Sequence, residues 1–242
     1  MDHTSLKILY EDPQIIVCVK PAGIPTQTKK IGLPDMVSLL KNHLAGQSPS
    51  GQPPYLALIH RLDQPVAGIL VFARTPAAAK TLNQQLTSHQ FGKYYRALVF
   101  GQPPKDEGTL ENYLVKDSRS NTSRVCAKDT PGAKSARLHY AIVKKGQGFF
   151  NLGRGIFENT TSPTELPTEL DIHLDTGRHH QIRVQLAAMG CPIIGDFKYG
   201  PGSPDPAATR PPLMLCAYRL EFFHPVTRKK LCFQLAKEEE GA

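Results

Sequence analysis

Residues 60–74 read His-Arg-Leu-Asp-Gln-Pro-Val-Ala-Gly-Ile-Leu-Val-Phe-Ala-Arg, and a short polar step there separates two apolar runs. The runs, residues 55–59 and 69–73, have the composition of β-strands, so Asp63 is predicted to lie in the connection between two strands. A carboxylate beside buried strands is costly to desolvate unless a cation or hydrogen bonds compensate it. On this pattern alone Asp63 is either structural, capping a turn or pairing with an interior arginine, or functional.

The remainder of the chain contains more predicted strands than helices. Apolar and alternating runs predict further strands at residues 14–20, 93–100, 135–144, 169–174, 213–223 and 230–235. Asp35 is a predicted cap for a helix ending near Leu44, and Thr75 caps one ending near His89.

A third helix is predicted from Thr176 or Gly177 to Met189, with Gly190 beyond its end. On that helix positions 179 and 183 share a face, and the apolar stripe consists of Ile182, Leu186 and Met189. Arg183 is then expected at the border of the buried face.

Two long segments show no clear periodicity. Residues 102–130 are polar and read as irregular, with basic side chains at Lys116, Arg119, Arg124 and Lys128. Residues 145–168 combine Gly-rich and Thr/Ser/Pro-rich pieces and read as a long hairpin or a mobile insertion.

Strands that do not alternate regularly with helices argue against a doubly wound parallel sheet. The predicted fold class is therefore α+β, with a mixed, largely antiparallel sheet flanked by helices. A chain of 242 residues is most simply one domain, here residues 1–242.

Composition narrows the partners and the compartment. Lys and Arg number 29 against 21 Asp and Glu, a net charge of +8, which suits a polyanion, although many basic proteins bind no nucleic acid. The five cysteines have no zinc-ligand spacing, and Cys18, Cys216 and Cys232 are expected to be buried reduced thiols. The N-terminus is no signal peptide, and no apolar stretch reaches membrane-spanning length, so a cytoplasmic protein without a membrane partner is expected.

The polar step also carries a family resemblance. His60-Arg61-Leu62-Asp63 and Gly68 match the signature of the RluA-type pseudouridine synthases, whereas Val66 and Ala67 depart from its Thr-Ser pair. Three further segments resemble the same family in the same order, so the resemblance runs from about residue 6 to about residue 235. They are Val-Lys-Pro-Ala-Gly-Ile-Pro at 19–25, Lys-Tyr-Tyr-Arg-Ala at 93–97, and Thr-Gly-Arg-His-His-Gln-Ile-Arg at 176–183 with its Gly195-Asp196 and Tyr199-Gly200 tail.

This resemblance implies a bent sheet with a central catalytic cleft and the isomerisation of uridine to pseudouridine in tRNA or rRNA, without cofactor or metal. It implies that Asp63 is the catalytic aspartate, attacking either C1′ of the sugar or C6 of the base. Arg183 is the arginine expected to pair with it, and Tyr95 is the active-site tyrosine. Tyr94 and Tyr95 must point to opposite faces of their strand, so only one of them can enter the cleft.

The remaining expected contacts concern RNA. Arg61 matches the position that inserts beside the extruded base, with a phosphate contact as its alternative role. Ile182 is a further substrate-binding position, and Lys116 and Lys128 are expected to contact RNA. The expected partner is RNA rather than DNA, and the expected state is a monomer.

Many relatives carry an S4-like domain ahead of the first strand; only a few residues precede Ile8, so none is expected here.

Two other functions compete with isomerisation. A non-catalytic RNA-binding relative would be favoured by loss of Asp63, Tyr95 or Arg183, all of which are present. A hydrolase would use His60 and Asp63, but the adjacent His179-His180 pair, pointing apart on a helix, would be a poor metal site. Gln185, which stands where relatives often have His, and the Val66-Ala67 pair are departures that bear on the target RNA.

Overall fold

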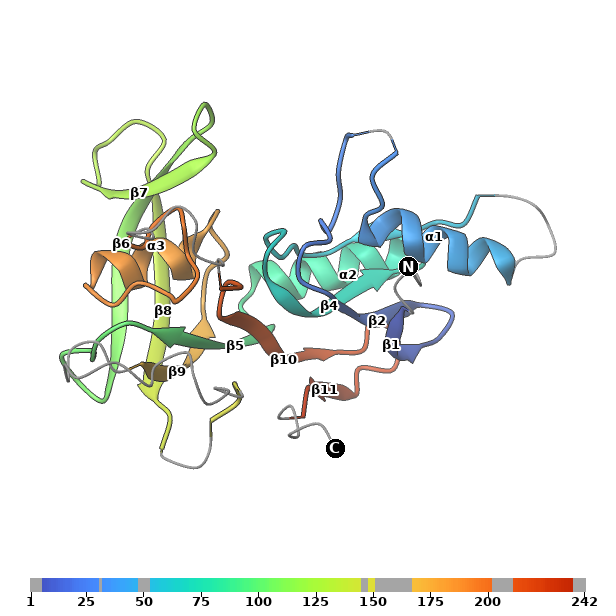
Figure 1. Cartoon of the computed structure of the whole chain (residues 1–242). Coiled ribbons are helices and arrows are strands. Elements are labelled where there is room, and N and C mark those ends of the chain that lie inside the picture. The colour runs from blue at the N-terminus through green and yellow to red at the C-terminus, as the bar shows by residue number, and fades with distance from the viewer. Residues whose placement is uncertain are drawn as a thin grey trace. The chain divides into compact units, whose positions relative to one another are not determined.

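The computed structural model describes residues 6–30, 32–47, 53–144, 148–150, 167–201 and 211–236 (Figure 1). The chain divides into two compact units, Met1–Lys93 with Ala217–Leu235 and Tyr94–Cys216 with Ala236–Ala242. Strands β5 (Gly92–Val99) and β10 (Leu215–Phe223) contribute residues to both units.

The first unit is built on strands that pair in the order β1-β2-β4-β10, with β3 on β4 and β11 on β10. All four pairs with a defined register, β1–β2, β2–β4, β3–β4 and β10–β11, are antiparallel. The strands are β1 (Lys7–Glu11), β2 (Ile15–Lys20), β3 (Ala57–Leu58), β4 (Ala67–Ala73) and β11 (Lys230–Gln234).

Burial explains why the two central strands read as continuous apolar runs. Residues 15–18 of β2 and 68–73 of β4 are buried on both faces. Val17, Val71 and Phe222 belong to one core cluster, which also takes up Ala78 and Leu82 of a helix. The strands predicted on either side of Asp63 therefore form, although β3 is only two residues long.

Two helices belong to this unit, and both begin at the predicted caps. α1 (Met36–Gly46) starts after Asp35, whose Oδ1 accepts from the Ser38 N–H at 2.7 Å. α2 (Pro76–Thr87) starts after Thr75, whose hydroxyl accepts from the Ala78 N–H at 3.1 Å.

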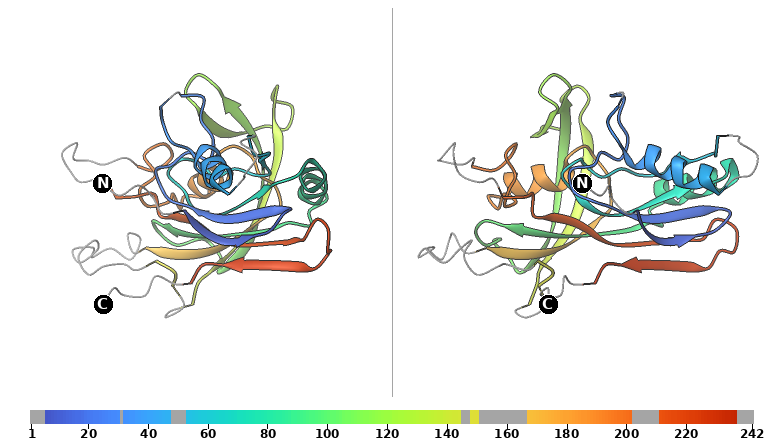
Figure 2. Two further views of the ribbon diagram at one scale, coloured as in Figure 1. Left: turned by 90° about the vertical axis from the view of Figure 1, so that its right-hand side faces the viewer. Right: turned by 45° about the vertical axis from the view of Figure 1, so that its right-hand side comes forward.

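The second unit has the strand order β5-β9-β8-β6-β7, and every neighbouring pair in it is antiparallel. Figure 2 shows the long strands β6 and β8 side by side, as their register requires. Leu114, Ala136 and Val184 form a small core between these strands and the helix α3. The elements are β6 (Glu107–Asp117), β7 (Thr122–Cys126), β8 (Lys134–Ile142), β9 (Thr168–Leu174) and α3 (Gln181–Ala188).

The prediction that residues 102–130 are irregular is wrong. Residues 107–126 of this segment form the β6–β7 hairpin, in which Leu114 pairs with Val125 and Asp117 with Thr122. Polar side chains occupy both faces of β6, whose positions alternate mainly between exposed and half-buried, so the segment has no apolar periodicity. Of the predicted insertion at 145–168, residues 145–147 and 151–166 lie outside the described residues.

One cysteine prediction is also wrong. Cys18 and Cys216 are buried free thiols as expected, but Cys232 is exposed. It lies on β11, where exposed and half-buried positions alternate, so its apolar neighbours do not make it a core residue.

The α+β prediction is confirmed, because strands dominate both units and the described residues contain only three helices. None of these helices is long and apolar enough to cross a membrane. The bend of the sheet and the catalytic cleft stay predictions.

Candidate active site

The loop that carries Asp63 is held through the backbone of both of its neighbours. The Thr26 hydroxyl donates to the Leu62 carbonyl at 2.9 Å and stands 3.2 Å from the Leu62 N–H, which donates to it. On the other side the Gln64 carbonyl accepts from the Gly23 N–H at 2.9 Å, and the Gln64 side chain donates back to the Gly23 carbonyl at 2.9 Å. Half-buried Asp63 is thus fixed by residues of the turn after β2.

A buried lysine completes this support. Lys20 has no solvent exposure, and its ammonium donates to the carbonyls of Gln64 at 2.9 Å, Pro21 at 2.9 Å and Ile24 at 2.6 Å. Burial lowers the pKa of Lys20 to about 8, against the opposing effect of the negative charge of Asp63. Lys20 therefore places a cation beside Asp63 while it ties the Lys-Pro-x-Gly turn to the loop.

His60, at the start of the loop, is suited to a scaffold role. Its ring lies edge-on to Phe91 with centroids 6.3 Å apart, and its buried Nε2 has no hydrogen-bond partner among the described residues. Burial and the nearby charge of Lys93 lower the pKa of His60 to about 3. A neutral, weakly basic imidazole of this kind is a poor general base at neutral pH.

Gly68 has a clear steric reason to be glycine. Its φ is +139°, and a Cβ at this position would lie 2.4 Å from the carbonyl oxygen of Ala217. Neighbouring Val66 is buried at 2 % exposure, so the apolar residue that replaces the expected Thr contributes to the core. Arg61 is exposed, as its expected RNA contact requires.

The two adjacent tyrosines of β5 point to opposite faces, as predicted. Tyr95 is 7 % exposed and pairs with Ile172 of β9. Tyr94 instead stacks on His173, with ring centroids 4.8 Å apart. Tyr95 is thus the tyrosine on the buried face of the strand.

The third helix begins later than predicted, at Gln181 rather than at Thr176 or Gly177. His180 has a left-handed backbone with φ of +54°, which interrupts any helix through it. Before it, the Gln181 carboxamide oxygen accepts from the Thr176 hydroxyl at 2.7 Å and from the Arg178 N–H at 2.9 Å. Gly190, with φ of +88°, follows the end of the helix as expected.

Arg183 is inside the protein rather than at the border of a buried face. Residues 181–186 are all buried, so α3 has no simple apolar stripe; Ile182 is 4 % and Leu186 0 % exposed, whereas Met189 is half-buried. Arg183 is 5 % exposed. Its Nε and Nη2 each donate to the carboxylate of Asp196 at 2.7 Å, a two-pronged ion pair.

Asp196 and Tyr199, from the Gly-Asp-x-x-Tyr-Gly tail, build the surroundings of this arginine. Burial would raise the pKa of Asp196, but Arg183 and the backbone N–H groups of Lys198 and Tyr199 outweigh burial and lower it. The Arg183 guanidinium also lies over the Tyr199 ring, 5.2 Å from its centroid. Asp196 is therefore the ionised partner that compensates a buried arginine.

Comparison with known proteins identifies the family. The description of the matching family is RNA pseudouridylate synthase, and the match covers residues 14–188. The chain belongs to the RNA pseudouridylate synthase family. These are RNA-modifying isomerases of the type that the His-Arg-Leu-Asp signature indicated.

Individual relatives agree with this assignment. Ribosomal large subunit pseudouridine synthase D of Nitrosomonas europaea is 34% identical over 226 residues, which are 91% of this chain and 58% of that protein. The chain thus spans less than two thirds of that relative. The dual-specificity RNA pseudouridine synthase RluA of Escherichia coli K12 is 30% identical over 229 residues, 95% of this chain and 92% of that protein.

A solved structure supports the fold. The human RNA pseudouridylate synthase domain containing 4 superposes with a TM-score of 0.70 at 21% identity, over 96% of this chain and 88% of that chain. This likeness confirms the pseudouridine synthase fold expected from the sequence.

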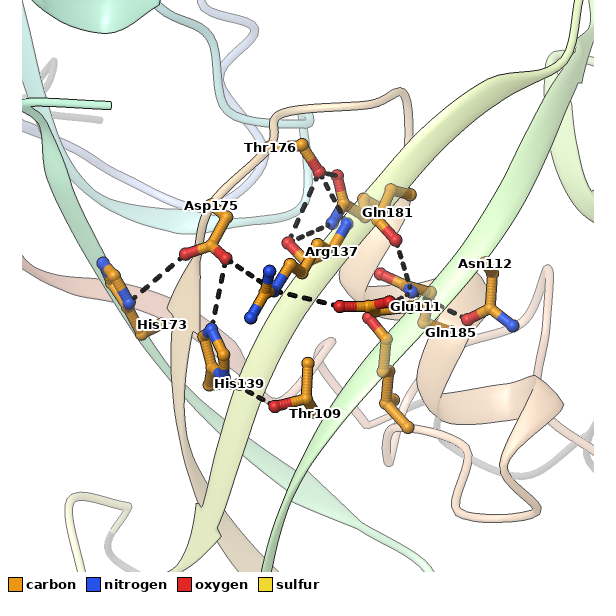
Figure 3. Close-up of polar contacts among 12 residues, drawn as sticks. Thr109, Glu111, Asn112, Arg137, His139, His173, Asp175, Thr176, Gln181 and Gln185 are labelled. Carbon is orange, nitrogen blue, oxygen red and sulfur yellow. Dashed lines mark hydrogen bonds and ion pairs between the residues drawn. The ribbon is translucent and has the colours of Figure 1, made fainter. Parts of the chain in front are cut away.

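Two glutamines tie α3 to neighbouring strands: Gln185, which departs from the family pattern, and Gln181, which matches it (Figure 3). Gln185, 1 % exposed, donates to the Asn112 side chain at 2.8 Å and to the Leu110 carbonyl at 3.1 Å, which ties α3 to β6. The side chain of Gln181 donates to the Arg137 carbonyl at 3.1 Å and so ties α3 to β8. Figure 3 also shows Asp175 between His139, His173 and Arg137.

The expected side-chain arrangement of His179 and His180 is wrong. The two residues precede α3, and their rings stack with centroids 3.7 Å apart. Burial, followed by the positive charges of Arg183, His179 and Lys198, lowers the pKa of His180 to about 3. Within the described part of the chain, no group of three or more His, Cys, Asp or Glu side chains is suited to a metal ion.

The predicted site residues fall in both units. Asp63 and Arg61 lie in the first unit. In the second, Tyr95 lies on β5, and Ile182 and Arg183 are neighbours on α3. Lys116 lies on the β6–β7 hairpin, and Lys128 follows shortly after it. The assembly of these residues into one site stays a prediction. Sequence reasoning assigned no role to Lys20, Asp196 or Tyr199, although all three stand in the motifs that carried the resemblance.

Proposed function

We propose that this protein isomerises uridine to pseudouridine in RNA, with Asp63 as the catalytic carboxylate. Family membership supports the reaction class. The observation that carries the assignment to Asp63 is its loop, because the backbone carbonyls of Leu62 and Gln64 are both held by buried side chains, those of Thr26 and Lys20. A catalytic group that is already held in place lowers the entropic part of the activation barrier.

The reaction breaks the C1′–N1 bond of uridine, turns the uracil and forms a C1′–C5 bond, after which the C5 hydrogen leaves as a proton and N1 takes up a proton. A carboxylate can attack C1′ or C6 as a nucleophile and is released again afterwards. No redox or phosphoryl transfer step occurs, so the proposal invokes neither cofactor nor metal. The buried cation of Lys20 favours the ionised carboxylate that either attack requires.

Tyr95 and Arg183 complete the proposed catalytic set. In this proposal Arg183 pairs with Asp63, while two of its nitrogens are held by Asp196. Tyr95 stacks against the uracil, and its hydroxyl takes part in removing the C5 proton. Ile182, next to Arg183, contributes an apolar contact to the base.

RNA recognition is assigned to exposed residues. Arg61 fills the space of the extruded base or contacts a phosphate. Lys116 and Lys128 contact phosphates; Arg119 and Arg124 are exposed on the same hairpin.

The target classes that we propose are tRNA and rRNA. The name of the Nitrosomonas relative, which refers to the large ribosomal subunit, supports rRNA as one of them. We further propose that the protein works as a monomer in the cytoplasm, an environment that suits its five free cysteines.

Release of tritium from RNA tests the proposal. Purified protein is incubated with tRNA and ribosomal RNA transcripts that carry uridine tritiated at C5, and the label released into water is measured. Wild-type protein should release label, and Asp63→Asn should release none while its RNA affinity stays within about twofold, since a neutral isostere leaves phosphate contacts intact. Release by Asp63→Asn at the wild-type rate would overturn the role of Asp63. RNA binding without release from any transcript by the wild type would favour a non-catalytic protein.

A further inference from the structure

Ser123 connects the β6–β7 hairpin to His179, which precedes α3, and to Tyr199, which follows it. It lies on β7 and is 6 % exposed, although its neighbour Arg124 is exposed. Its hydroxyl is 2.9 Å from Nδ1 of His179, and its backbone N–H donates to the Tyr199 hydroxyl at 2.8 Å. A single hairpin residue therefore makes two hydrogen bonds to the residues on either side of α3.

A third bond fixes the turn of the hairpin. The Lys198 ammonium donates to the carbonyl of Asn121 at 2.9 Å. Asn121 has a φ of +50°, a left-handed conformation that few non-glycine residues adopt and that reverses the chain in this turn. The hairpin is thus attached at its turn and along β7 to the Gly-Asp-x-x-Tyr-Gly segment.

The same segment holds Arg183. Tyr199 places its ring against the guanidinium of Arg183, and Asp196 accepts from both Arg183 and the Tyr199 N–H, the latter at 3.2 Å. The path from Ser123 to Arg183 therefore needs only Tyr199, and it is made of direct contacts between buried or half-buried groups.

The hydrogen-bond roles along this path are mutually consistent. The Tyr199 oxygen accepts the Ser123 N–H, so its own proton can go to Nδ1 of His180, 2.6 Å away. This requires a neutral His180, in agreement with its pKa of about 3. A connected network of hydrogen bonds in a buried setting restrains its members to one arrangement.

We propose that Ser123 and Tyr199 are positioning residues that couple the β6–β7 hairpin to the guanidinium of Arg183. The inference rests on the proposed function, in which basic residues of the hairpin region bind RNA and Arg183 serves the catalytic aspartate. RNA held by the hairpin is then kept in a fixed relation to the arginine. The coupling acts on the rate of isomerisation more than on affinity, because neither side chain is assigned a contact with RNA.

Single-turnover kinetics test this coupling. Tyr199→Phe removes the hydroxyl that accepts the Ser123 N–H, whereas Ser123→Ala keeps that N–H and removes the hydroxyl bond to His179, whose ring stacks on His180, the partner of the Tyr199 hydroxyl. With enzyme in excess over tritiated RNA, each variant should lower the rate constant about tenfold, since small displacements of catalytic groups have effects of this order or larger. The dissociation constant for RNA should stay within about twofold, because the exposed lysines and arginines remain. Ser123→Thr, which keeps the hydroxyl on a strand, should restore most of the rate.

The matched control is Ser120→Ala. Its hydroxyl belongs to the same hairpin but, among the described residues, bonds only to Asp117 at 2.9 Å and Thr122 at 2.6 Å, both within the turn. This variant should keep the wild-type rate constant. A second readout independent of catalysis is the NMR resonance of the Arg183 Nε–H, which Ser123→Ala and Tyr199→Phe should shift and Ser120→Ala should not.

The outcomes separate the two proposals. Wild-type activity with unchanged rates and an unchanged Arg183 resonance in both variants would overturn the coupling and leave the proposed function standing. Weaker RNA binding at an unchanged rate constant would also overturn it, because Ser123 would then only shape the hairpin. A wild-type protein that releases no label would overturn the proposed function, and with it the assignment of this coupling to catalysis.

Discussion

Lys20 donates a hydrogen bond of 2.9 Å from its fully buried ammonium to the backbone carbonyl of Gln64, the residue that follows Asp63. The same ammonium holds two carbonyls of its own turn, so one side chain joins two segments 44 positions apart in the chain. A buried lysine costs free energy unless its charge and its donors are used. In this protein both are used, beside the residue proposed to carry out the chemistry.

The pH dependence of activity should reflect the protonation state of Lys20. As pH rises through about 8, the Lys20 ammonium loses its charge, and Asp63 loses a neighbouring cation. The single-turnover rate should therefore fall above pH 8, whereas Lys20→Met should be slow at all pH values and lack this decline. Identical profile shapes for the two proteins would contradict the role of Lys20.

Unfolding does not account for such a decline. The pKa of Lys20 is lowered from 10.5 in the unfolded chain to about 8 in the folded protein. Between these values the unfolded chain binds more protons, so the contribution of this group to stability rises with pH. Urea unfolding at pH 7 and 9 checks that the wild type stays folded over the range where its rate falls.

The buried pair of Arg183 and Asp196 should dominate local stability. Arg183→Met leaves the buried Asp196 carboxylate without its cation, with only backbone N–H donors among the described residues, and should lower the free energy of unfolding by about 3–5 kcal/mol. The matched control Glu111→Gln removes one partner of the exposed Arg137–Glu111 pair, whose side chains are 50% and 65% exposed, and should cost less than about 1 kcal/mol. Equal losses in urea denaturation would argue against a special role for the buried pair.

Acid should remove the contribution of the ionised Asp196 carboxylate to the stability of the fold. Its pKa is lowered on folding from an ordinary value of 3.8, so the stabilisation is complete above that value and is lost as pH falls through the folded pKa. The stability difference between wild type and Asp196→Asn should accordingly shrink below pH 4. A difference that is constant from pH 7 to pH 3 would show that the charge of Asp196 is not what stabilises the fold.

Gly68 should tolerate no side chain. Gly68→Ala places a methyl group 2.4–2.6 Å from atoms of Ala217 on a backbone with φ of +139°, so we expect a loss of several kcal/mol or failure to fold. Gly46→Ala, where no atom lies within 4 Å, is the control and should be neutral or slightly stabilising. Thermal unfolding compares them, and similar midpoints would refute the steric argument.

His60 should not act as a base. Because the pKa of His60 is about 3, its charge does not change between pH 5 and 9. His60→Gln should keep the shape of the wild-type pH–rate profile, even if packing against Phe91 is weakened. Disappearance of an acidic limb in this variant would instead support the hydrolase-like role that His60 and Asp63 could share.

Sequence reasoning succeeded where local patterns decide the structure. The buried runs of β2 and β4 and the caps Asp35 and Thr75 were predictable because burial and capping leave a direct mark on composition. The β6–β7 hairpin was not, because polar residues on both faces carry no apolar period. The start of α3 was missed because the left-handed backbone at His180, a non-glycine residue, is not visible in residue types.

The candidate site shows the same contrast between what local motifs reveal and what tertiary packing decides. Family motifs pointed to Asp63, Tyr95 and Arg183, but the partner of a buried charge depends on tertiary contacts. The pairing of Arg183 with Asp196 spans 13 positions, and the bond from Lys20 to Gln64 spans 44. Such contacts are set by how strands and loops pack, so the residues could be named from the sequence while their roles could not.

The most direct test of the central claim is pseudouridine mapping in total RNA, by carbodiimide labelling and reverse transcription, from cells with and without this gene. The account predicts that a discrete pseudouridine disappears without the gene. Wild-type protein should restore that site, and Asp63→Asn, expressed to the same level, should not. An unchanged pseudouridine map, or restoration by Asp63→Asn, would contradict it.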